Sequence, residues 1–200
     1  MTVAAVMTYD SLVNDIQTYL ERTDQATLDK IPQCIMLAEQ IIAADLKFLG
    51  NLQVVTSTMV QGDNVIAKPA RWRKTVSMNV TVGGRRQPVL LRSYEYIREY
   101  WPDPAQEDPP KFFCDYDYEH WLVGPTPDVA YNYEVLYYER VQPLDSSNQS
   151  NWFTQYAPQA MLYGTLLQAM PFLKNDERMP MWQGNYDRII QVLKEENLTR

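Results

Sequence analysis

The sequence predicts an α+β fold, in which a four-helix bundle is made by both chain ends and an antiparallel β-sheet or small barrel is inserted between them. Apolar residues recur at helical spacing in residues 1–50 and again in residues 143–200. In residues 51–142 they recur mostly at every second position, as in half-buried strands, around one short helix. Because helices and strands are segregated along the chain, α+β is favoured over a βαβ parallel sheet. We expect the three regions to form one structural unit.

Residues 1–50 predict two helices, which usually pack antiparallel when only a few residues join them. Thr8 is placed to cap the first helix, and the second is expected to begin around Thr27 or Pro32 and to end before Gly50. The buried stripe of the first helix is predicted to contain Tyr9, Leu12, Val13, Ile16, Tyr19 and Leu20. That of the second is predicted to contain Ile31, Ile35, Ala38, Ile42, Leu46 and Leu49.

The central region, residues 51–142, predicts several strands. Gly83-Gly84 is a good two-residue hairpin turn, and Ser93 is placed to begin a short helix over residues 93–101. Two further strands are expected over residues 111–123 and 130–141, joined by a turn rich in glycine and proline. The strand before the hairpin is predicted to bury Trp72, Val76, Met78, Val80 and Val82.

Residues 143–200 predict the second pair of helices. Pro158 fits the first turn of one helix, and the other is expected to start near Asp176, with Pro180 early enough to be tolerated. The stripe of the first is predicted to contain Phe153, Tyr156, Ala160, Tyr163, Leu167 and Met170. That of the last is predicted to contain Met179, Trp182, Tyr186, Ile189, Ile190 and Leu193.

Charge is distributed unevenly along a chain whose net charge is −7. Residues 68–98 carry eight basic side chains and one acidic one, whereas residues 1–67 and 99–200 have net charges of −5 and −9. The acidic total argues against a general nucleic-acid binder. A polarised molecule suits a subunit that must meet its neighbours in one orientation. The alternative is a solvated strand face. The residues expected to meet an acidic neighbour are Arg71, Arg73, Lys74, Arg85 and Arg86.

No pattern of catalytic or metal-binding residues stands out. His120 is the single histidine, and an ordinary side chain on a strand face is favoured over a hydrolase centre built on it. Cys34 and Cys114 are too few and too far apart in sequence for a zinc site, and we expect both to be reduced. The acids Asp115, Asp117 and Glu119 would share one strand face without the glycine-containing calcium-loop pattern. We therefore expect no cofactor, no metal and no enzymatic activity.

Segments for export or membrane insertion are not predicted. Residues 1–7 lack the positive start of a signal peptide, and no apolar run approaches the ~20 residues that cross a bilayer. The 24 aromatic residues, 14 of them tyrosine, exceed what a lone monomer needs and favour an obligate oligomer.

Two blocks of the sequence resemble the adaptor proteins of the head-to-tail connector of tailed bacteriophages, similar to those of short-tailed phages. The C-terminal block contains Tyr133 to Asn148, Asn151-Trp152, Tyr156-Ala157-Pro158 and Leu162 to Ala169. The N-terminal block contains Tyr19 to Asp24, Ile31-Pro32 and Leu37-Ala38-Glu39.

The resemblance implies a virion structural subunit that is made in the host cytoplasm. Such subunits form a homo-oligomeric ring, usually of twelve copies, that docks beneath the portal after genome packaging. The ring extends the DNA channel, through which DNA passes without specific binding, and offers a platform to a tail or nozzle protein. The family has no catalytic residues that could be assigned to positions in this chain.

The last helix is the predicted contact with the portal or neck. The residues proposed for it are Trp182, Tyr186, Ile189 and Leu193, and packing within their own bundle is the alternative, above all for Ile189 and Leu193. Two other functions stay open. One is a different virion part, such as a tail-completion or nozzle subunit, and the other is a nucleic-acid-binding module built on the basic segment.

Overall fold

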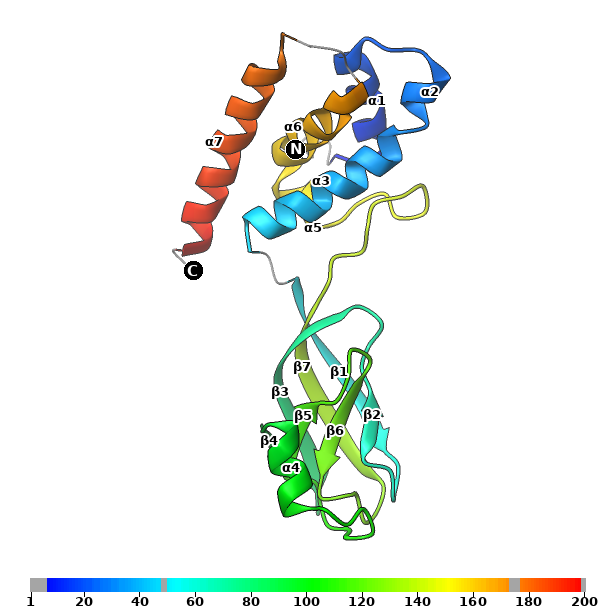
Figure 1. Cartoon of the computed structure of the whole chain (residues 1–200), viewed down its shortest axis with the longest axis vertical. Coiled ribbons are helices and arrows are strands. Elements are labelled where there is room, and N and C mark those ends of the chain that lie inside the picture. The colour runs from blue at the N-terminus through cyan, green and yellow to red at the C-terminus, as the bar shows by residue number, and fades with distance from the viewer. Residues whose placement is uncertain (1–6, 48–49, 173–176, 199–200) are drawn as a thin grey trace, which may run out of the picture. The chain divides into compact units, whose positions relative to one another are not determined.

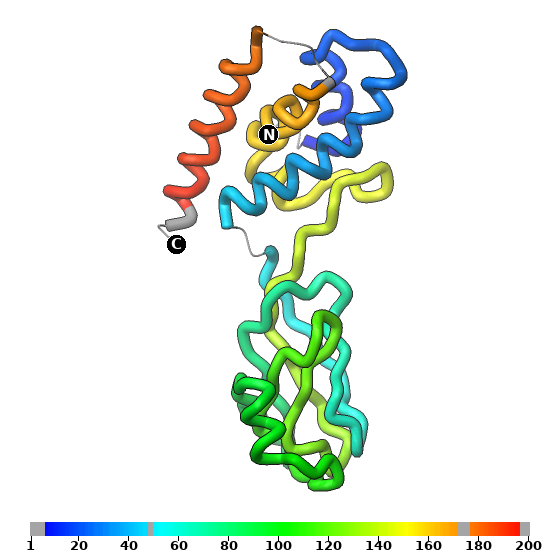
Figure 2. The backbone as a smooth tube through the Cα atoms, viewed as in Figure 1, coloured from blue at the N-terminus to red at the C-terminus, as the bar shows by residue number. Residues whose placement is uncertain are grey.

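A computed structural model describes residues 7–47, 50–172 and 177–198 of the chain (Figure 1). The chain divides into two compact units. The helical unit is formed by Met1–Phe48 and Val141–Arg200, and the strand unit by Leu49–Arg140. Figure 2 shows how the blue N-terminal and orange C-terminal segments lie side by side in the helical unit.

The helical unit contains four longer helices and several short ones. The longer helices are α1 (Tyr9–Leu20), α3 (Ile31–Asp45), α6 (Pro158–Ala169) and α7 (Met179–Leu198). The short ones are α2 (Gln25–Leu28), α5 (Trp152–Tyr156) and the 3-10 turn Met170–Phe172. Thr8 caps α1 as predicted, because its side chain accepts from the amide of Ser11 while the Ser11 hydroxyl accepts from the amide of Thr8.

The predicted four-helix bundle is wrong. In such a bundle each helix buries one stripe against two neighbours, whereas here α1, α3, α5 and α7 all pack on α6. The predicted stripe fails because Tyr156, which belongs to α5, is exposed, and because the buried residues of α6 lie on several sides of that helix. They are Ala160, Met161, Gly164, Thr165, Leu166 and Ala169. A helix that is apolar on several sides takes the centre of the unit, and the other helices cover it.

The second predicted helix is shorter than expected. Ile31, Ile35, Ala38, Ile42 and Leu46 are all buried as predicted. The helix ends at Asp45, however, and Lys47 takes a left-handed conformation with a φ of 51°. Leu49 and Asp176, which the predictions also used, lie outside the described residues.

The strand unit is one curled sheet of seven strands in the order β1-β7-β3-β4-β5-β6-β2. Its longer strands are β1 (Asn51–Met59), β3 (Trp72–Val82), β4 (Arg85–Leu91) and β7 (Tyr131–Glu139). Its shorter strands are β2 (Val65–Ala67), β5 (Phe112–Asp115) and β6 (His120–Gly124). The Gly83-Gly84 turn joins β3 to β4 as predicted, and both glycines have positive φ, the backbone that this hairpin requires.

The predicted α+β class is also wrong, because the fold is mixed α/β. Strands β4 and β5 are parallel, while every other named pair in the sheet is antiparallel. Helix α4 (Tyr94–Tyr100), which Ser93 caps as predicted, lies in the connection between these two parallel strands. The long loop of residues 102–110 after α4 gives the chain enough length to return for a parallel strand. The sequence periodicity carried no signal for this βαβ connection.

The core of the strand unit is formed by both halves of the curled sheet. Met78 and Val135 from one half pack in the same cluster as Phe113 and Trp121 from the other. The Thr75 hydroxyl accepts hydrogen bonds from the indoles of both Trp72 and Trp121, at 3.0 and 2.9 Å. A register shift between Thr75 and Ser77 leaves Val76 exposed, which corrects the prediction that Val76 is buried.

Gly50 directly precedes β1 and has a conformation that only glycine adopts readily. Its φ is +115°, and a Cβ atom there would lie 1.8 Å from the carbonyl oxygen of Glu139. Gly184 lies on the exposed side of α7 and would meet no atom within 4 Å. We predict that Gly50→Ala lowers the free energy of unfolding by at least about 2 kcal/mol, through backbone strain and this clash. Gly184→Ala should raise it by about 0.5–1 kcal/mol. Urea unfolding measures both, and equal effects would contradict the argument.

Candidate partner-binding surfaces

The helical unit has a shallow groove between α6 and α7, with a volume of about 530 Å³. Tyr156 and Val192, both exposed, lie at this groove together with Pro158. Of the residues predicted to contact the portal, Ile189 and Leu193 line the groove. Gln159, Asn185 and Arg188 also line the groove, so it offers both apolar and polar contacts. An open groove of this kind fits an amphipathic segment of a partner.

The other two predicted contact residues, Trp182 and Tyr186, are buried in the core of the helical unit. The Tyr186 hydroxyl donates to Asp45 at 2.8 Å, and burial together with this hydrogen bond raises the pKa of Tyr186. The Arg178 guanidinium lies 5.1 Å from the centre of the Trp182 ring. These side chains hold α7 against its neighbours, while Ile189 and Leu193 lie partly open beside them.

The predicted basic residues lie in two separate places. Arg71, Arg73 and Lys74 flank the start of β3, whereas Arg85 and Arg86 begin β4 after the hairpin. The length of β3 separates the two groups by roughly 25 Å. Arg71 pairs with Glu139 at 3.0 Å and Arg86 with Glu134 at 3.1 Å. The structure therefore does not gather them into one basic patch.

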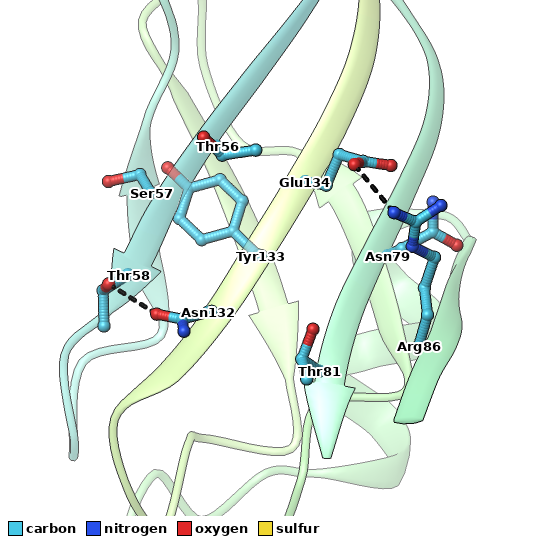
Figure 3. A pocket seen from close by; sticks show the side chains of 9 residues that line it. All are labelled: Thr56, Ser57, Thr58, Asn79, Thr81, Arg86, Asn132, Tyr133 and Glu134. Atoms are coloured by element: carbon cyan, nitrogen blue, oxygen red, sulfur yellow. Dashed lines mark hydrogen bonds and ion pairs between the residues drawn. The ribbon is translucent and has the colours of Figure 1, made fainter. Parts of the chain in front are cut away.

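The outer face of the sheet around Arg86 is hollowed and polar (Figure 3). Its side chains come from β1, β3, β4 and β7, and the hollow measures about 390 Å³. Thr58 donates to the Asn132 amide oxygen at 2.9 Å, and Arg86 and Glu134 form the ion pair that Figure 3 marks. The hollow is lined by Thr56, Ser57, Thr58, Asn79, Thr81, Arg86, Asn132, Tyr133 and Glu134. Hydroxyls, amides and one paired arginine make a surface suited to hydrogen bonding.

Tyrosines and arginines cluster around α4. The Tyr96 ring lies 4.5 Å from that of Tyr100, and the Arg92 guanidinium lies 5.7 Å from the Tyr96 ring. Arg98 donates to the Tyr94 hydroxyl at 3.1 Å and lies over the ring of the same tyrosine. These residue types dominate the energetics of protein interfaces.

His120 is the first residue of β6 and follows a chain reversal after Asp115, which corrects the prediction of one strand over residues 111–123. The chain reverses between β5 and β6, and the Asp117 carboxylate accepts from the amides of Glu119 and His120. Asp115, Asp117 and Glu119 therefore do not share a strand face. The His120 ring contacts the same carboxylate at 2.9 Å, and this hydrogen bond lowers the pKa of Asp117. The geometry assigns His120 to closing the turn.

Within residues 7–47, 50–172 and 177–198, no three His, Cys, Asp or Glu side chains are grouped so that they could hold a metal ion. In the same part of the chain, no helix combines the length and apolar character that crossing a membrane requires.

A comparison with protein families decides what kind of protein these surfaces serve. Residues 7–200 match the model of the SU10 adaptor protein family. The chain belongs to this family. The resemblance to phage head-to-tail adaptors is thereby confirmed, whereas the closer likeness to adaptors of short-tailed phages stays a prediction. No curated protein matches the chain.

Family membership makes the chain a structural adaptor protein of a bacteriophage. It places the protein in the virion, in association with other virion proteins such as a portal or tail protein. Such a role needs surfaces that bind proteins, and the groove beside α7 and the surfaces of the strand unit are the candidates.

The two sequence blocks that resemble the adaptors meet in the core of the helical unit. Glu39 of the first block and Asn151 of the second are both buried, and the Asn151 side-chain amide donates to the Glu39 carboxylate. The amide of Leu144 donates to the same carboxylate at 3.3 Å. The Asn151 side-chain oxygen accepts from Phe153 and Thr154 and so caps α5. Spacing in the sequence gave no sign of this contact, since 112 residues separate its partners.

This contact predicts a pair of compensating substitutions. Asn151→Asp keeps the oxygen that caps α5, but it removes the donor and buries a second carboxylate beside Glu39. We expect it to lower the free energy of unfolding at pH 7 by at least about 2 kcal/mol. Adding Glu39→Gln restores a donor facing an acceptor, and it should recover at least half of the loss. Urea unfolding of the single and double variants measures this. Additive losses would contradict a direct contact.

Glu39 also makes stability depend on pH. Burial raises its pKa above the usual value of 4.5, more than the hydrogen bonds from Asn151 and Leu144 lower it. A raised folded-state pKa means that the contribution of Glu39 is fully present below the unfolded-state pKa and is lost as pH rises through the folded-state value. We predict that wild type loses stability relative to Glu39→Gln as the pH rises from 3.5 towards 8. A difference that stays constant over this range would refute the assignment.

Proposed function

We propose that this chain forms a homo-oligomeric ring, of twelve copies, that docks beneath the portal once the genome is packaged. The ring extends the DNA channel and offers a platform to a tail or nozzle protein. The observation that carries the proposal is the match to the SU10 adaptor protein family over residues 7–200. An adaptor of this kind acts by binding, and we expect it to have no catalytic activity and no cofactor. The subunit would be made in the host cytoplasm and act in the virion neck.

The groove beside α7 supports portal docking through the helical unit. Ile189, Val192 and Leu193 line it, and Val192 is exposed. Trp182 and Tyr186 of the same helix are buried in the core and hold the helix in place. A rigidly held helix loses little conformational entropy when a partner covers it. We assign the portal contact to these residues.

The charges support a channel through which DNA passes without specific binding. Each copy adds a net charge of −7 to the ring. Several basic residues of the segment 68–98 are engaged within the strand unit, as the Lys68 ammonium shows. It pairs with Asp115 at 3.0 Å and lies 3.7 Å from the centre of the Trp72 ring. Paired cations release few counterions from DNA, so binding to it should be weak.

Co-migration with purified portal rings tests the proposal. We expect wild-type protein to migrate with the portal in a density gradient, and Val192→Glu to bind at least tenfold more weakly, a loss of about 1.4 kcal/mol, because it replaces an exposed apolar side chain of the groove with a charged one. Val129→Glu changes an exposed valine on a loop of the strand unit and should bind like wild type.

Two outcomes would contradict the proposal. Wild-type protein that ignores the portal but binds a tail or nozzle protein would favour a tail-completion or nozzle subunit. Tight DNA binding with a steep salt dependence, abolished when Arg85 and Arg86 are reversed to glutamate, would favour a nucleic-acid-binding module.

A further inference from the structure

The helical unit has a second groove, lined by residues of α3, α6 and α7, whose places in the unit Figure 1 shows. We call it the α3 groove. Its volume is about 410 Å³, and its walls include Leu167 together with Ile41 and Met179, which are 39% and 43% exposed. It shares no lining residue with the groove beside α7 that we assign to the portal. The two grooves can therefore hold different partners at the same time.

The α3 groove is acidic. Among the described residues that line it, the charged ones are Asp45 and Asp187, and none is basic. Burial, the hydrogen bond to Asp45 and the charges of both aspartates raise the pKa of Tyr186, so both carboxylates act on one phenol. The helical unit as a whole carries eight basic and thirteen acidic side chains, a net charge of −5. A cation is the occupant that this groove favours.

Apolar walls beside two carboxylates suit an arginine in particular. Its aliphatic stem can lie along apolar surface while the guanidinium keeps polar partners. Within the groove, Tyr186 donates to one oxygen of Asp45 at 2.8 Å, and Gln183 donates to one oxygen of Asp187 at 2.7 Å. The other oxygen of each carboxylate has no donor among the described residues, so it can accept from a guanidinium.

The hairpin between β3 and β4 presents an arginine of this kind. Residues 82–88 include two basic side chains and no acidic one, and the two glycines of the turn leave the tip narrow. Because successive side chains of a strand point to opposite faces, Arg85 and Arg86 diverge. Arg86 pairs with Glu134 at 3.1 Å, whereas Arg85 is exposed and its side chain has no polar partner within the described part of the chain.

Arg85 differs in this respect from the other arginines of the strand unit. Each of the others has an ion pair, a hydrogen bond or a ring contact inside the molecule. They are Arg71, Arg73, Arg86, Arg92, Arg98 and Arg140. The one arginine that the strand unit leaves without a partner therefore lies at the tip of a narrow hairpin, where a neighbouring molecule can reach it.

We propose that Arg85 of one copy enters the α3 groove of the next copy in the ring and pairs with Asp45 and Asp187. The inference rests on the proposed function, since it names a contact that closes the ring. A second copy is favoured as the occupant because every copy carries both halves of the contact, while the groove beside α7 serves the portal. Hairpin and groove are different surfaces, so the contact is head-to-tail and repeats until rotation closes it.

Charge reversal tests this contact within a single chain. Arg85→Glu places an acid opposite two carboxylates, and Asp187→Arg places a cation opposite Arg85. Each reversal alone should lower the fraction of subunits in closed rings at least about tenfold, because like charges across an interface oppose binding. The double variant should regain most of the rings, since each swapped hairpin then meets a swapped groove.

Native mass spectrometry with portal rings present gives the readout. Arg22→Glu and Asp15→Arg make the same two charge changes at exposed positions outside the groove, and both should form rings like wild type. Arg85 and Asp187 are exposed as well, so the fold should be unaffected, which circular dichroism checks. If a reversal loses its fold, the neutral Arg85→Gln or Asp187→Asn takes its place, with a smaller loss of rings expected.

Rings formed at the wild-type level by either single reversal would overturn the inference and leave the proposed function standing. A double variant with no more rings than the single ones would also overturn it, because the two charges would then not be partners. So would a single reversal that abolishes portal binding while the copies still associate, which would assign the α3 groove or the hairpin to the portal. Wild-type protein that forms no ring with the portal present would refute the proposed function itself, and the inference with it.

Discussion

The buried contact between Glu39 and Asn151 is the constraint on which the helical unit depends. It ties α3, from the first quarter of the chain, to the segment that returns from the strand unit. The same segment is bound to α1, because the amide of Tyr9 donates to the carbonyl of Gln149. A buried carboxylate without donors would cost several kcal/mol, so the return path must place Leu144 and Asn151 where they now lie. This requirement brings both chain ends into one unit and lets the strand unit be inserted between them.

The protein pairs its polar groups internally and exposes apolar side chains, a combination that suits a subunit that binds other proteins. Polar groups of the strand unit find partners within the unit. The Thr75 hydroxyl accepts hydrogen bonds from two indoles, and the Lys68 ammonium pairs with the Asp115 carboxylate and lies over the Trp72 ring. Apolar side chains are also exposed on both units, for example Leu52 and Val54 on β1 and Tyr156 and Val192 at the groove beside α7. An adaptor needs contacts with more than one partner, and separate surfaces on separate units supply them without competition.

Local features could be predicted from the sequence because they depend on a few neighbouring residues. Thr8 and Ser93 cap their helices, and the Gly83-Gly84 turn has the backbone that its glycines allow. Features that depend on distant contacts could not. The periodicity of the C-terminal third suggested one stripe per helix, but α6 is apolar on several sides and lies at the centre of its unit, which excludes the four-helix bundle. A bulge moved Val76 outward, and Asp117 turned one expected strand into a hairpin.

The candidate contact residues were predictable only in part. Ile189 and Leu193 do line a groove, but the sequence could not separate them from Trp182 and Tyr186, which repeat at the same helical spacing and are buried. The exposure of Leu52 and Val54 was not predicted, because the sequence alone gave β1 no pairing register. Pairing with β7 defines which side each residue faces, and that pairing joins residues about 80 positions apart.

Electron cryomicroscopy of portal rings incubated with the purified subunit tests the central claim most directly, that this protein works by being buried between copies of itself and a partner. The account predicts a closed ring under the portal, in which a portal segment occupies the groove beside α7. Portal rings that remain bare, beside subunits that stay monomeric, would contradict it.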